Sequence, residues 1–518
     1  MTRSAISPPR YEPAALALLI LTYLLVGALY ATQTPAWQVP DEPAHYNYIA
    51  QLAENGCCPV LAMGDYDQHY LSELTSARFA PAVTGRLGAV QYEDHQPPLY
   101  YLLAWPVFAL TGGDLTALRL FSVVIGAGVA AMAWATARAL FPTRPWYALT
   151  TAAFVAFVPQ HTAMLAGVNN DALAELWIGA ALLACVLYRR GGEDGLPQPH
   201  PAILGALAGL AGLTKTTGYF VVVIALAAVF LRWRRVIPSS ASLASRLRSV
   251  VPLTPADLRP ASPLPHEARG PESAHPQDIS PLPTVGEGAG GEGKNRAGAA
   301  LRPLLIAALW VILVAAAVNL PWWLRNAATY GGLDIAGLGR HDAVVVGQPR
   351  TADWIADNGL GGLLSRFVQF TFNSFWGQFG WMAAPMPGWI YAGLLAFTGA
   401  ALAGLALALA RNQRKQEEVT PAQRDGVLLL ALTLAITAAQ YLFYNVTFVQ
   451  HQGRYLFPAL IPISFVVALG LDGWIRPLGE RFHLPMAVRW IPPAVVWLGF
   501  AALDVYALVR VVVPSLTP

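Results

Sequence analysis

The chain has 518 residues, of which 55% are hydrophobic and only 12% are charged, and its mean hydropathy is +0.45. A soluble domain carries about 25% charged residues, so this composition excludes a soluble globular enzyme, and a content of three cysteines excludes a disulfide-rich scaffold. The net charge of +3 is small, and no basic patch with interleaved aromatic residues predicts binding to nucleic acid.

Long apolar runs instead predict an all-α polytopic membrane protein, because a helix needs about 20 apolar residues to cross the hydrocarbon core. The first run ends without a small-residue cleavage site, so we interpret it as a helix rather than a signal peptide. Residues 98–112 are apolar but short, which predicts a helix that lies in the membrane interface. The eleven predicted spans are 13–31, 116–140, 146–162, 172–188, 201–214, 217–231, 301–320, 389–410, 427–445, 455–471 and 491–512.

Basic residues predict the direction of the chain, because cytoplasmic loops carry an excess of lysine and arginine. The groups that fall on one side when the N-terminus is cytoplasmic are Arg3 and Arg10, Arg138 and Arg144, Arg189 and Arg190, Arg232, Arg234 and Arg235, Arg411, Arg414, Lys415 and Arg424, and Arg476, Arg481 and Arg489. This orientation places the loops 32–115 and 321–388 outside. We expect the bilayer to be the cytoplasmic membrane.

Residues 236–300 divide the chain into two transmembrane modules, 1–235 and 301–518. The segment holds 10 prolines and 7 glycines in 65 residues and almost no aromatic residues. Such a composition cannot bury a core. We therefore expect a disordered cytoplasmic insert, to which no function is assigned.

The first outer loop is acidic, and its most suggestive segment is Pro40-Asp41-Glu42-Pro43, directly after the first span. Two adjacent carboxylates at the membrane surface could provide a general base where a lipid-borne substrate arrives. The alternative is structural, because an acid followed by proline also typifies a capped helix N-terminus.

A second acid, Asp171, lies in the outer turn before the fourth span and could likewise cap a helix. Three cations are predicted at outer span ends, Lys215, Arg325 and Arg454, against the positive-inside bias. Each therefore calls for a partner, which could be a phosphate. The alternative is that these side chains reach out to lipid headgroups.

Other polar motifs carry weaker signals. Asp65-Tyr66-Asp67 resembles the metal-binding pair of nucleotide-sugar enzymes, but no soluble domain accompanies it, so we interpret it as a solvated loop. Cys57 and Cys58 are adjacent, a spacing that rarely forms a disulfide, and we interpret them as ordinary thiols. His95 opens an aromatic-rich surface helix that could be a lid, a shelf for an acceptor, or simply a capped amphipathic helix.

Six short motifs follow one another along the chain. They are Asp-Glu-Pro at 41–43, His-Gln-Pro-Pro-Leu-Tyr-Tyr at 95–101, Asn-Asp-Ala at 170–172, the turn with Lys215, Pro-Trp-Trp-Leu-Arg-Asn at 321–326 and Gln-Gly-Arg-Tyr-Leu-Phe-Pro at 452–458. Taken in this order, they resemble the motifs of the GT-C superfamily, polytopic glycosyltransferases that use polyprenyl-phosphate sugars. Within this superfamily, the chain most resembles relatives of the protein mannosyltransferases and aminoarabinose transferases, and DUF2142-like proteins.

The resemblance implies a GT-C-type helical bundle with an outward-facing site. Asp41 would be the catalytic base, with Glu42 beside it and Asp171 as the second acid. Residues implied or suggested to bind substrate are His45, His95, Lys215, Arg325, Gln452, Arg454 and Tyr455.

The implied donor is a polyprenyl-phosphate-linked sugar, and the acceptor is a glycan, a lipid or a protein. We expect no cofactor, and a divalent metal to be dispensable, because a monophosphate leaving group needs less help from a metal than a diphosphate. Three alternatives stay open: a transporter or flippase for lipid-linked sugars, an O-antigen polymerase or ligase using arginines of the 321–388 loop, and a non-catalytic partner in cell-surface polymer assembly.

Overall fold

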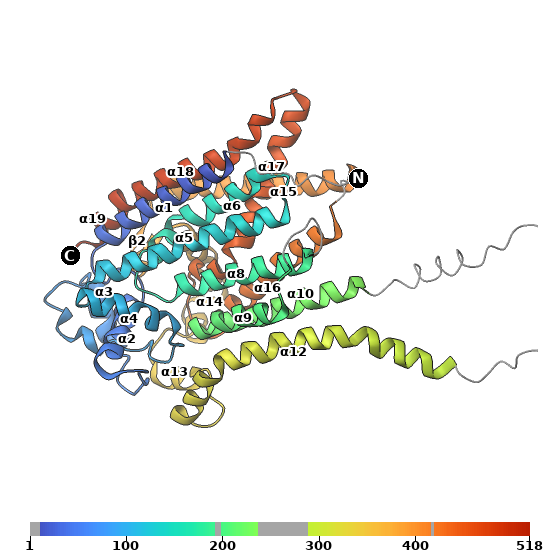
Figure 1. Ribbon diagram of the computed structural model, residues 1–518. Coiled ribbons are helices and arrows are strands. Elements are labelled where there is room, and N and C mark those ends of the chain that lie inside the picture. Colours follow the sequence, from blue (N-terminus) through green and yellow to red (C-terminus); the bar gives the residue numbers. More distant parts are fainter. Residues whose placement is uncertain (1–10, 192–197, 237–288, 416–418) are drawn as a thin grey trace, which may run out of the picture. The chain divides into compact units, whose positions relative to one another are not determined.

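The computed structural model describes residues 11–191, 198–236, 289–415 and 419–518. Residues 1–229 and 307–518 belong to one compact unit, and residues 230–306 belong to a second. The predicted insert therefore falls mostly outside the described residues, although its last residues, 289–300, are helical. The predicted all-α polytopic fold is confirmed (Figure 1).

The helices of the N-terminal half are α1 (Glu12–Gln33), α2 (Glu42–Asn55), α3 (Gln68–Ser76), η1 (Thr84–Ala89), α4 (Leu99–Thr111), α5 (Leu115–Leu140), α6 (Pro145–Phe157), α7 (Pro159–Leu165), α8 (Asp171–Arg190), α9 (Pro201–Thr214), η2 (Thr216–Phe220) and α10 (Val221–Val236). The predicted short helix at 98–112 is present as α4. Its placement in the membrane interface stays a prediction.

The helices of the C-terminal half are α12 (Ala289–Tyr330), α13 (Leu338–Val344), α14 (Thr351–Trp376), α15 (Gly388–Lys415), α16 (Pro421–Thr447), η4 (Gly453–Ala459), α17 (Leu460–Arg481), η5 (Met486–Trp490), α18 (Ile491–Ala507), η6 (Leu508–Val512) and α19 (Val513–Leu516). Between α14 and α15, β1 (Gln378–Phe379) and β2 (Ala384–Pro385) form a short antiparallel hairpin in which Gln378 lies opposite Pro385.

Within the described residues, nine helices are long and apolar enough to cross a membrane, and a tenth is possible if α6 and α7, bent by 65° at Val158, form one span. The sequence predicted eleven spans, so that count is not confirmed. The difference is α9, which has only 14 residues. At 1.5 Å per residue it extends about 21 Å, less than the roughly 30 Å of a hydrocarbon core.

Helix α6 is the centre of this unit, because every one of its residues is buried. It packs against α5, α17 and α18, and α5 packs in turn against α1 and α8 (Figure 1). A helix that is hydrophobic all round is expected in such a central position. Helices α15 and α17 cross closely, since a β-carbon at Gly404 would lie 2.0 Å from the carbonyl oxygen of Gly470. Small residues commonly permit such contacts between membrane helices.

The first outer loop is anchored on the bundle by aromatic residues. Helices α2 and α4 pack against each other, and Tyr48, Tyr100 and Tyr101 are fully buried in a cluster that also includes Leu118 of α5 and Leu173 of α8. The rings of Tyr48 and Tyr101 stack with their centroids 3.7 Å apart. This packing holds the start of α2 over the ends of α5 and α8, where the predicted acids lie.

Candidate functional site

Asp41 is the centre of the candidate site, and its side chain does not cap α2 although it occupies the N-cap position. Its backbone has φ 68°, in the left-handed region that is uncommon for residues other than glycine. Its carboxylate makes no capping hydrogen bond to α2. Instead, Oδ2 accepts a hydrogen bond from Arg454 Nη2 at 2.7 Å, and Oδ1 accepts one from the Tyr92 hydroxyl at 2.8 Å. The structure thus joins residues separated by 413 positions and argues against the capping alternative.

Arg454 is held in place by the segment around it. Gln452 Oε1 accepts from Arg454 Nε at 2.8 Å, and the ring of Tyr455 lies beneath the guanidinium, 5.2 Å away. Gly453 lets this segment press against α14, because a β-carbon there would lie 2.3 Å from the carbonyl oxygen of Thr371. The Gln-Gly-Arg-Tyr motif therefore has a physical reason: glycine permits the close approach and its neighbours orient the cation.

Asp171 and Lys215 form a second ion pair beside the first. Asp171 begins α8, and Lys215 lies between α9 and η2. The turn is fixed by Asn170, whose amide donates to the carbonyl oxygen of Thr214 at 3.2 Å. The two ion pairs lie within electrostatic range, because Arg454 attracts Asp171 and repels Lys215. Two carboxylates and two cations predicted from separate motifs are thus brought together.

His45 and Glu93 complete the charged surroundings of Asp41. His45 is buried and shares a hydrogen bond of 2.8 Å with the Tyr101 hydroxyl. Burial lowers the pKa of His45, against the opposing pull of Glu93 and Asp41. Burial raises the pKa of Glu93, and the charge of Asp41 raises it further.

The pKa of Asp41 is shifted in the opposite direction from that of Glu93. Burial raises the pKa of Asp41, but the positive charges of Arg454 and His45 and the hydrogen bonds from Arg454 and Tyr92 outweigh it, so the net pKa is lowered. Neighbouring carboxyl groups with pKa values pushed in opposite directions are typical of catalytic sites. Tyr92 and Glu93 were missed as site residues. The signal was available, since both stand in the segment that singled out His95.

His95 lies in the same loop but has different neighbours. It is buried, its Nδ1 lies 3.1 Å from the carbonyl oxygen of Tyr92, and its ring packs on His341 of α13 with the centroids 4.4 Å apart. Burial lowers the pKa of His95 to about 4. His95 therefore ties the loop that carries Tyr92 to α13, and contact with a substrate is still only a prediction.

Glu42 has a different environment from its neighbour Asp41. Its side chain is fully buried and pairs with Arg119 of α5, with Nη2 to Oε2 at 2.6 Å and Nε to Oε1 at 2.8 Å. The carboxylate also accepts from the backbone N–H groups of Trp37 at 3.1 Å and Val168 at 3.2 Å. With four donors on two oxygens, this geometry favours a structural role over the catalytic one expected from the sequence.

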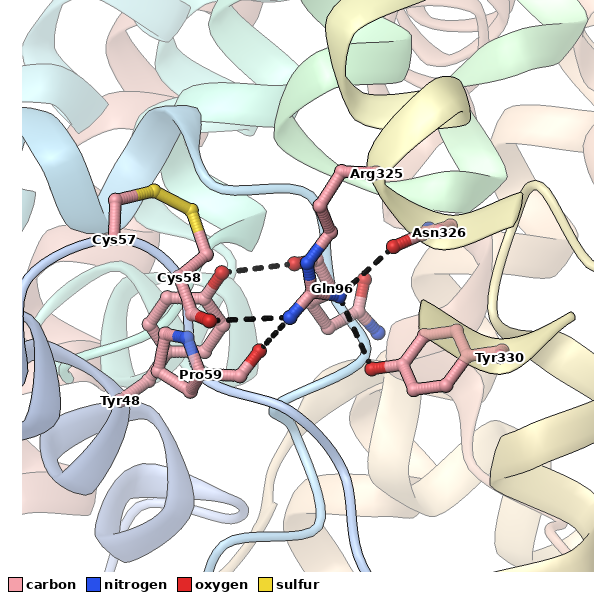
Figure 2. Close-up of a disulfide and its surroundings, with 8 residues drawn as sticks. All are labelled: Tyr48, Cys57, Cys58, Pro59, Gln96, Arg325, Asn326 and Tyr330. Atoms are coloured by element: carbon pink, nitrogen blue, oxygen red, sulfur yellow. Dashed lines mark hydrogen bonds between the residues drawn. A yellow bond between two sulfur atoms is a disulfide. The ribbon is translucent and has the colours of Figure 1, made fainter. Parts of the chain in front are cut away.

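Arg325 has protein partners of its own in the first outer loop, and its binding of a donor phosphate stays a prediction. Figure 2 shows its guanidinium reaching the carbonyl oxygens of Cys58, at 3.1 Å, and Pro59, and also the hydroxyl of Tyr330. Cys57 and Cys58 are joined by a disulfide, so the interpretation as ordinary thiols was wrong (Figure 2). Arg325 fastens this loop to the end of α12.

The Asp65-Tyr66-Asp67 motif serves its own loop, as expected. Asp67 Oδ1 caps α3 by accepting from the N–H of Tyr70 at 3.0 Å, and Asp65 accepts from the N–H of Ala62. In the part of the chain that the structure describes, no three residues of the types His, Cys, Asp and Glu are placed to hold a metal ion.

Comparison with known proteins supports the resemblance inferred from the motifs. Residues 95–254 match the family of dolichyl-phosphate-mannose-protein mannosyltransferases. Over that stretch the chain is similar to a glycosyltransferase family. The matched residues include His95, Asp171 and Lys215, whereas Asp41 and Arg454 lie outside them. No curated protein matches the chain.

Several solved structures match this chain over nearly its whole length, at low identity. The oligosaccharyltransferase of Archaeoglobus fulgidus, in complex with zinc and sulfate, is 15% identical with a TM-score of 0.49, over 95% of this chain and 53% of that one. The same enzyme with an inhibitory peptide and dolichol phosphate is 12% identical with a TM-score of 0.49, over 96% of this chain and 56% of that one. ArnT of Cupriavidus metallidurans, bound to undecaprenyl phosphate, is 13% identical with a TM-score of 0.46, over 98% of this chain and 74% of that one. The chain spans about half the length of the oligosaccharyltransferase.

Proposed function

We propose that this protein is a membrane glycosyltransferase that moves a sugar from a polyprenyl-phosphate donor to an acceptor at the outer face of the cytoplasmic membrane. One observation carries the proposal: Asp41, held by Arg454 and Tyr92, lies beside the Asp171–Lys215 pair at one end of the helical bundle. The family match and the arginine pattern of the loops support the reaction class and the orientation, respectively.

The chemistry follows from the charges. The acceptor hydroxyl attacks the anomeric carbon of the donor while Asp41 takes its proton, and the bond between that carbon and the phosphate oxygen breaks. The electron pair leaves with the polyprenyl phosphate, whose growing negative charge is stabilised by Arg454 and Lys215. A single displacement inverts the anomeric centre.

Glu93 lies close enough to Asp41 for the two charges to interact. A protonated carboxyl there adds no repulsion against the phosphate. Burial favours the neutral form of Glu93, whereas Arg454 and Tyr92 favour the ionised form of Asp41, so Asp41 is the better candidate for the base.

The test is transfer by the purified protein from a panel of polyprenyl-phosphate sugars. General-base assistance contributes about 10²–10⁴-fold, so Asp41→Asn should lower kcat by that factor. The matched control is Glu73→Gln, which removes an exposed carboxylate from α3 in the same outer loop and should leave kcat unchanged. Full activity of a folded Asp41→Asn protein would refute the assignment.

We also expect transfer to continue in EDTA, because two cations of the protein already face the position proposed for the leaving monophosphate. The measurement compares kcat before and after chelation, with added Mg²⁺ and Mn²⁺ as controls. Complete loss on chelation, restored by one of the two ions, would show that the reaction depends on a metal.

The alternative of an O-antigen polymerase or ligase drew on arginines of the 321–388 loop. Arg340 donates to the carbonyl oxygen of Leu61 at 2.8 Å, Arg350 pairs with Asp342 at 3.6 Å, and Arg366 stacks on Trp354. These local partners favour structural roles. We therefore keep the glycosyltransferase proposal alone.

A further inference from the structure

Tyr444 lies in the last turn of α16, next to the segment that carries Arg454. Its ring meets that of Tyr455 edge-on, with the centroids 5.7 Å apart, and the guanidinium of Arg454 lies 5.2 Å from the Tyr455 ring. The Tyr444 side chain is within electrostatic range of Arg454 and of two carboxyl groups of the site, Asp41 and Glu93. Tyr444 therefore borders the charged site, although it stands in none of the six motifs.

The hydroxyl of Tyr444 makes no hydrogen bond to any residue that the structure describes. The side chain is only partly buried, and its oxygen is not closed to solvent. Other tyrosine hydroxyls nearby already have partners. That of Tyr92 donates to Asp41, and that of Tyr441, one turn earlier on α16, shares a hydrogen bond of 2.6 Å with Thr371. The Tyr444 hydroxyl is therefore available to a ligand.

The face of α16 that carries Tyr444 borders both turns that supply the proposed phosphate cations. Gln440 lies one helical turn before Tyr444, so the two side chains are neighbours on one face. The amide of Gln440 lies 3.5 Å from the carbonyl oxygen of Thr217, two residues after Lys215. Tyr444 itself packs against the segment of Arg454. A phosphate that lay between Lys215 and Arg454 would therefore have this face of α16 beside it.

The adjacent side chains of α16 face outwards. Leu442, Phe443 and Val446 are exposed, and α16 is long and apolar enough to cross a membrane. A polyprenyl chain favours such a surface, whereas its phosphate must stay with polar groups. Tyrosine is also common at membrane interfaces as an anchor, but anchoring does not account for a position beside the charges of the site. Tyr444 thus lies between a lipid-exposed surface and the proposed phosphate position.

The chemistry of the free hydroxyl favours a phosphate oxygen as its partner. Hydrogen bonds to ionised groups are about twice as strong as those between neutral groups. A neutral donor has a second advantage in this site. Arg454 already lowers the pKa of Asp41, and a further cation would lower it more and weaken the proposed base. A tyrosine hydroxyl binds the phosphate without adding positive charge.

We propose that the Tyr444 hydroxyl donates a hydrogen bond to a phosphate oxygen of the polyprenyl-phosphate donor, as a third phosphate-binding group beside Arg454 and Lys215. The inference rests on the proposed function and adds a residue that no motif marks. Tyr444 acts in binding of the lipid phosphate and takes no part in proton transfer.

The test measures binding of undecaprenyl phosphate to the purified full-length protein, by titration calorimetry in mixed micelles. From the strength of a hydrogen bond to an ionised group, Tyr444→Phe should raise Kd about ten-fold or more. Undecaprenol, which lacks the phosphate, should bind both proteins equally, a result that a merely structural role would not give. The matched control is Tyr441→Phe, whose hydroxyl is engaged by Thr371, and it should keep the Kd of the wild type for undecaprenyl phosphate.

Each contrary outcome overturns a defined part of the reasoning. An unchanged Kd for undecaprenyl phosphate in Tyr444→Phe refutes the inference and leaves the proposed function standing, and so does an equal loss for undecaprenol. Weaker binding of the sugar-loaded donor alone would assign the hydroxyl to the sugar and overturn the phosphate contact. A Tyr444→Phe protein that fails to fold would show that the hydroxyl serves the protein itself. If the wild type bound neither undecaprenyl nor dolichyl phosphate, the proposed function would fall as well.

Discussion

Replacing Arg119 by methionine should destabilise the fold strongly, because it strands a buried carboxylate. Only 3% of the Arg119 side chain and none of the Glu42 side chain is exposed, and the two are joined by paired hydrogen bonds of 2.6 and 2.8 Å. Removing one partner of such a pair costs about 3–5 kcal/mol. Arg119 also donates to the carbonyl oxygen of Thr34 at 2.7 Å. We therefore expect Arg119→Met to lose at least about 3 kcal/mol of unfolding free energy.

The assay is denaturant unfolding in mixed detergent micelles, arranged as a double-mutant cycle with Glu42→Gln. The double variant should lose less than the sum of the two single variants, by roughly 1–3 kcal/mol, because neither charge is then left without its partner. The matched control is Arg86→Met, whose side chain is 69% exposed and lies 4.0 Å from Asp67. Such a surface pair contributes at most about 1 kcal/mol.

A loss of less than about 1 kcal/mol in Arg119→Met would refute the reasoning. A second result bears on the role of Glu42 itself. If Glu42→Gln kept its stability but lost transfer activity, the direct catalytic role first expected for Glu42 would have to be restored. If it lost stability while the folded fraction retained kcat, the structural role would be supported.

Two further predictions concern pH. Tyr92→Phe removes a hydrogen bond to ionised Asp41, so the pKa of Asp41 should rise and the acid limb of kcat/KM should move to higher pH by up to about one unit, measured as a pH–rate profile. An unmoved acid limb would exclude this role for Tyr92. The second prediction concerns His95, whose pKa burial lowers from 6.5 to about 4. Between these two pH values the unfolded chain binds more protons at His95 than the folded protein does. The free energy of unfolding should therefore fall by about 3 kcal/mol as the pH drops from 6.5 towards 4. Thermal unfolding at pH 7.5 and 4.5 should show a smaller pH dependence in His95→Gln, and an equal dependence would contradict the assignment.

The sequence predicted most of the helices because hydrophobic length is a local property. Runs such as 116–140 and 172–188 reappear almost unchanged as α5 and α8. The same reasoning counted α9 as a span, although its length falls short. The sequence reasoning also assigned the residues of α14 to the loop 321–388. This helix carries polar residues along its length, and it is interrupted at Gly359, where φ is positive.

The site was predictable only where a motif marked a residue. Asp41 and Arg454 stood in short distinctive patterns, and the structure pairs them. Arg325 carried the same signal, a cation at an outer span end, but backbone carbonyl oxygens of the loop at 57–59 meet its need for a partner. Carbonyl oxygens exist at every residue, so no sequence pattern reveals which ones an arginine will reach. Arg119 went unnoticed for a related reason: its partner Glu42 lies 77 positions away in the chain.

The pairing of Asp41 with Arg454 has a consequence for the proposed order of events. Arg454 contributes to the lowered pKa of Asp41, so it weakens Asp41 as a base while the pair is intact. A donor phosphate that draws the guanidinium to itself removes this influence, and Asp41 becomes more basic only once the donor is bound. Because kcat/KM reports the free enzyme and kcat the complex, the acid limb of kcat should lie at higher pH than that of kcat/KM. Coincident limbs would mean that Arg454 stays on Asp41 throughout and that Lys215 alone holds the phosphate.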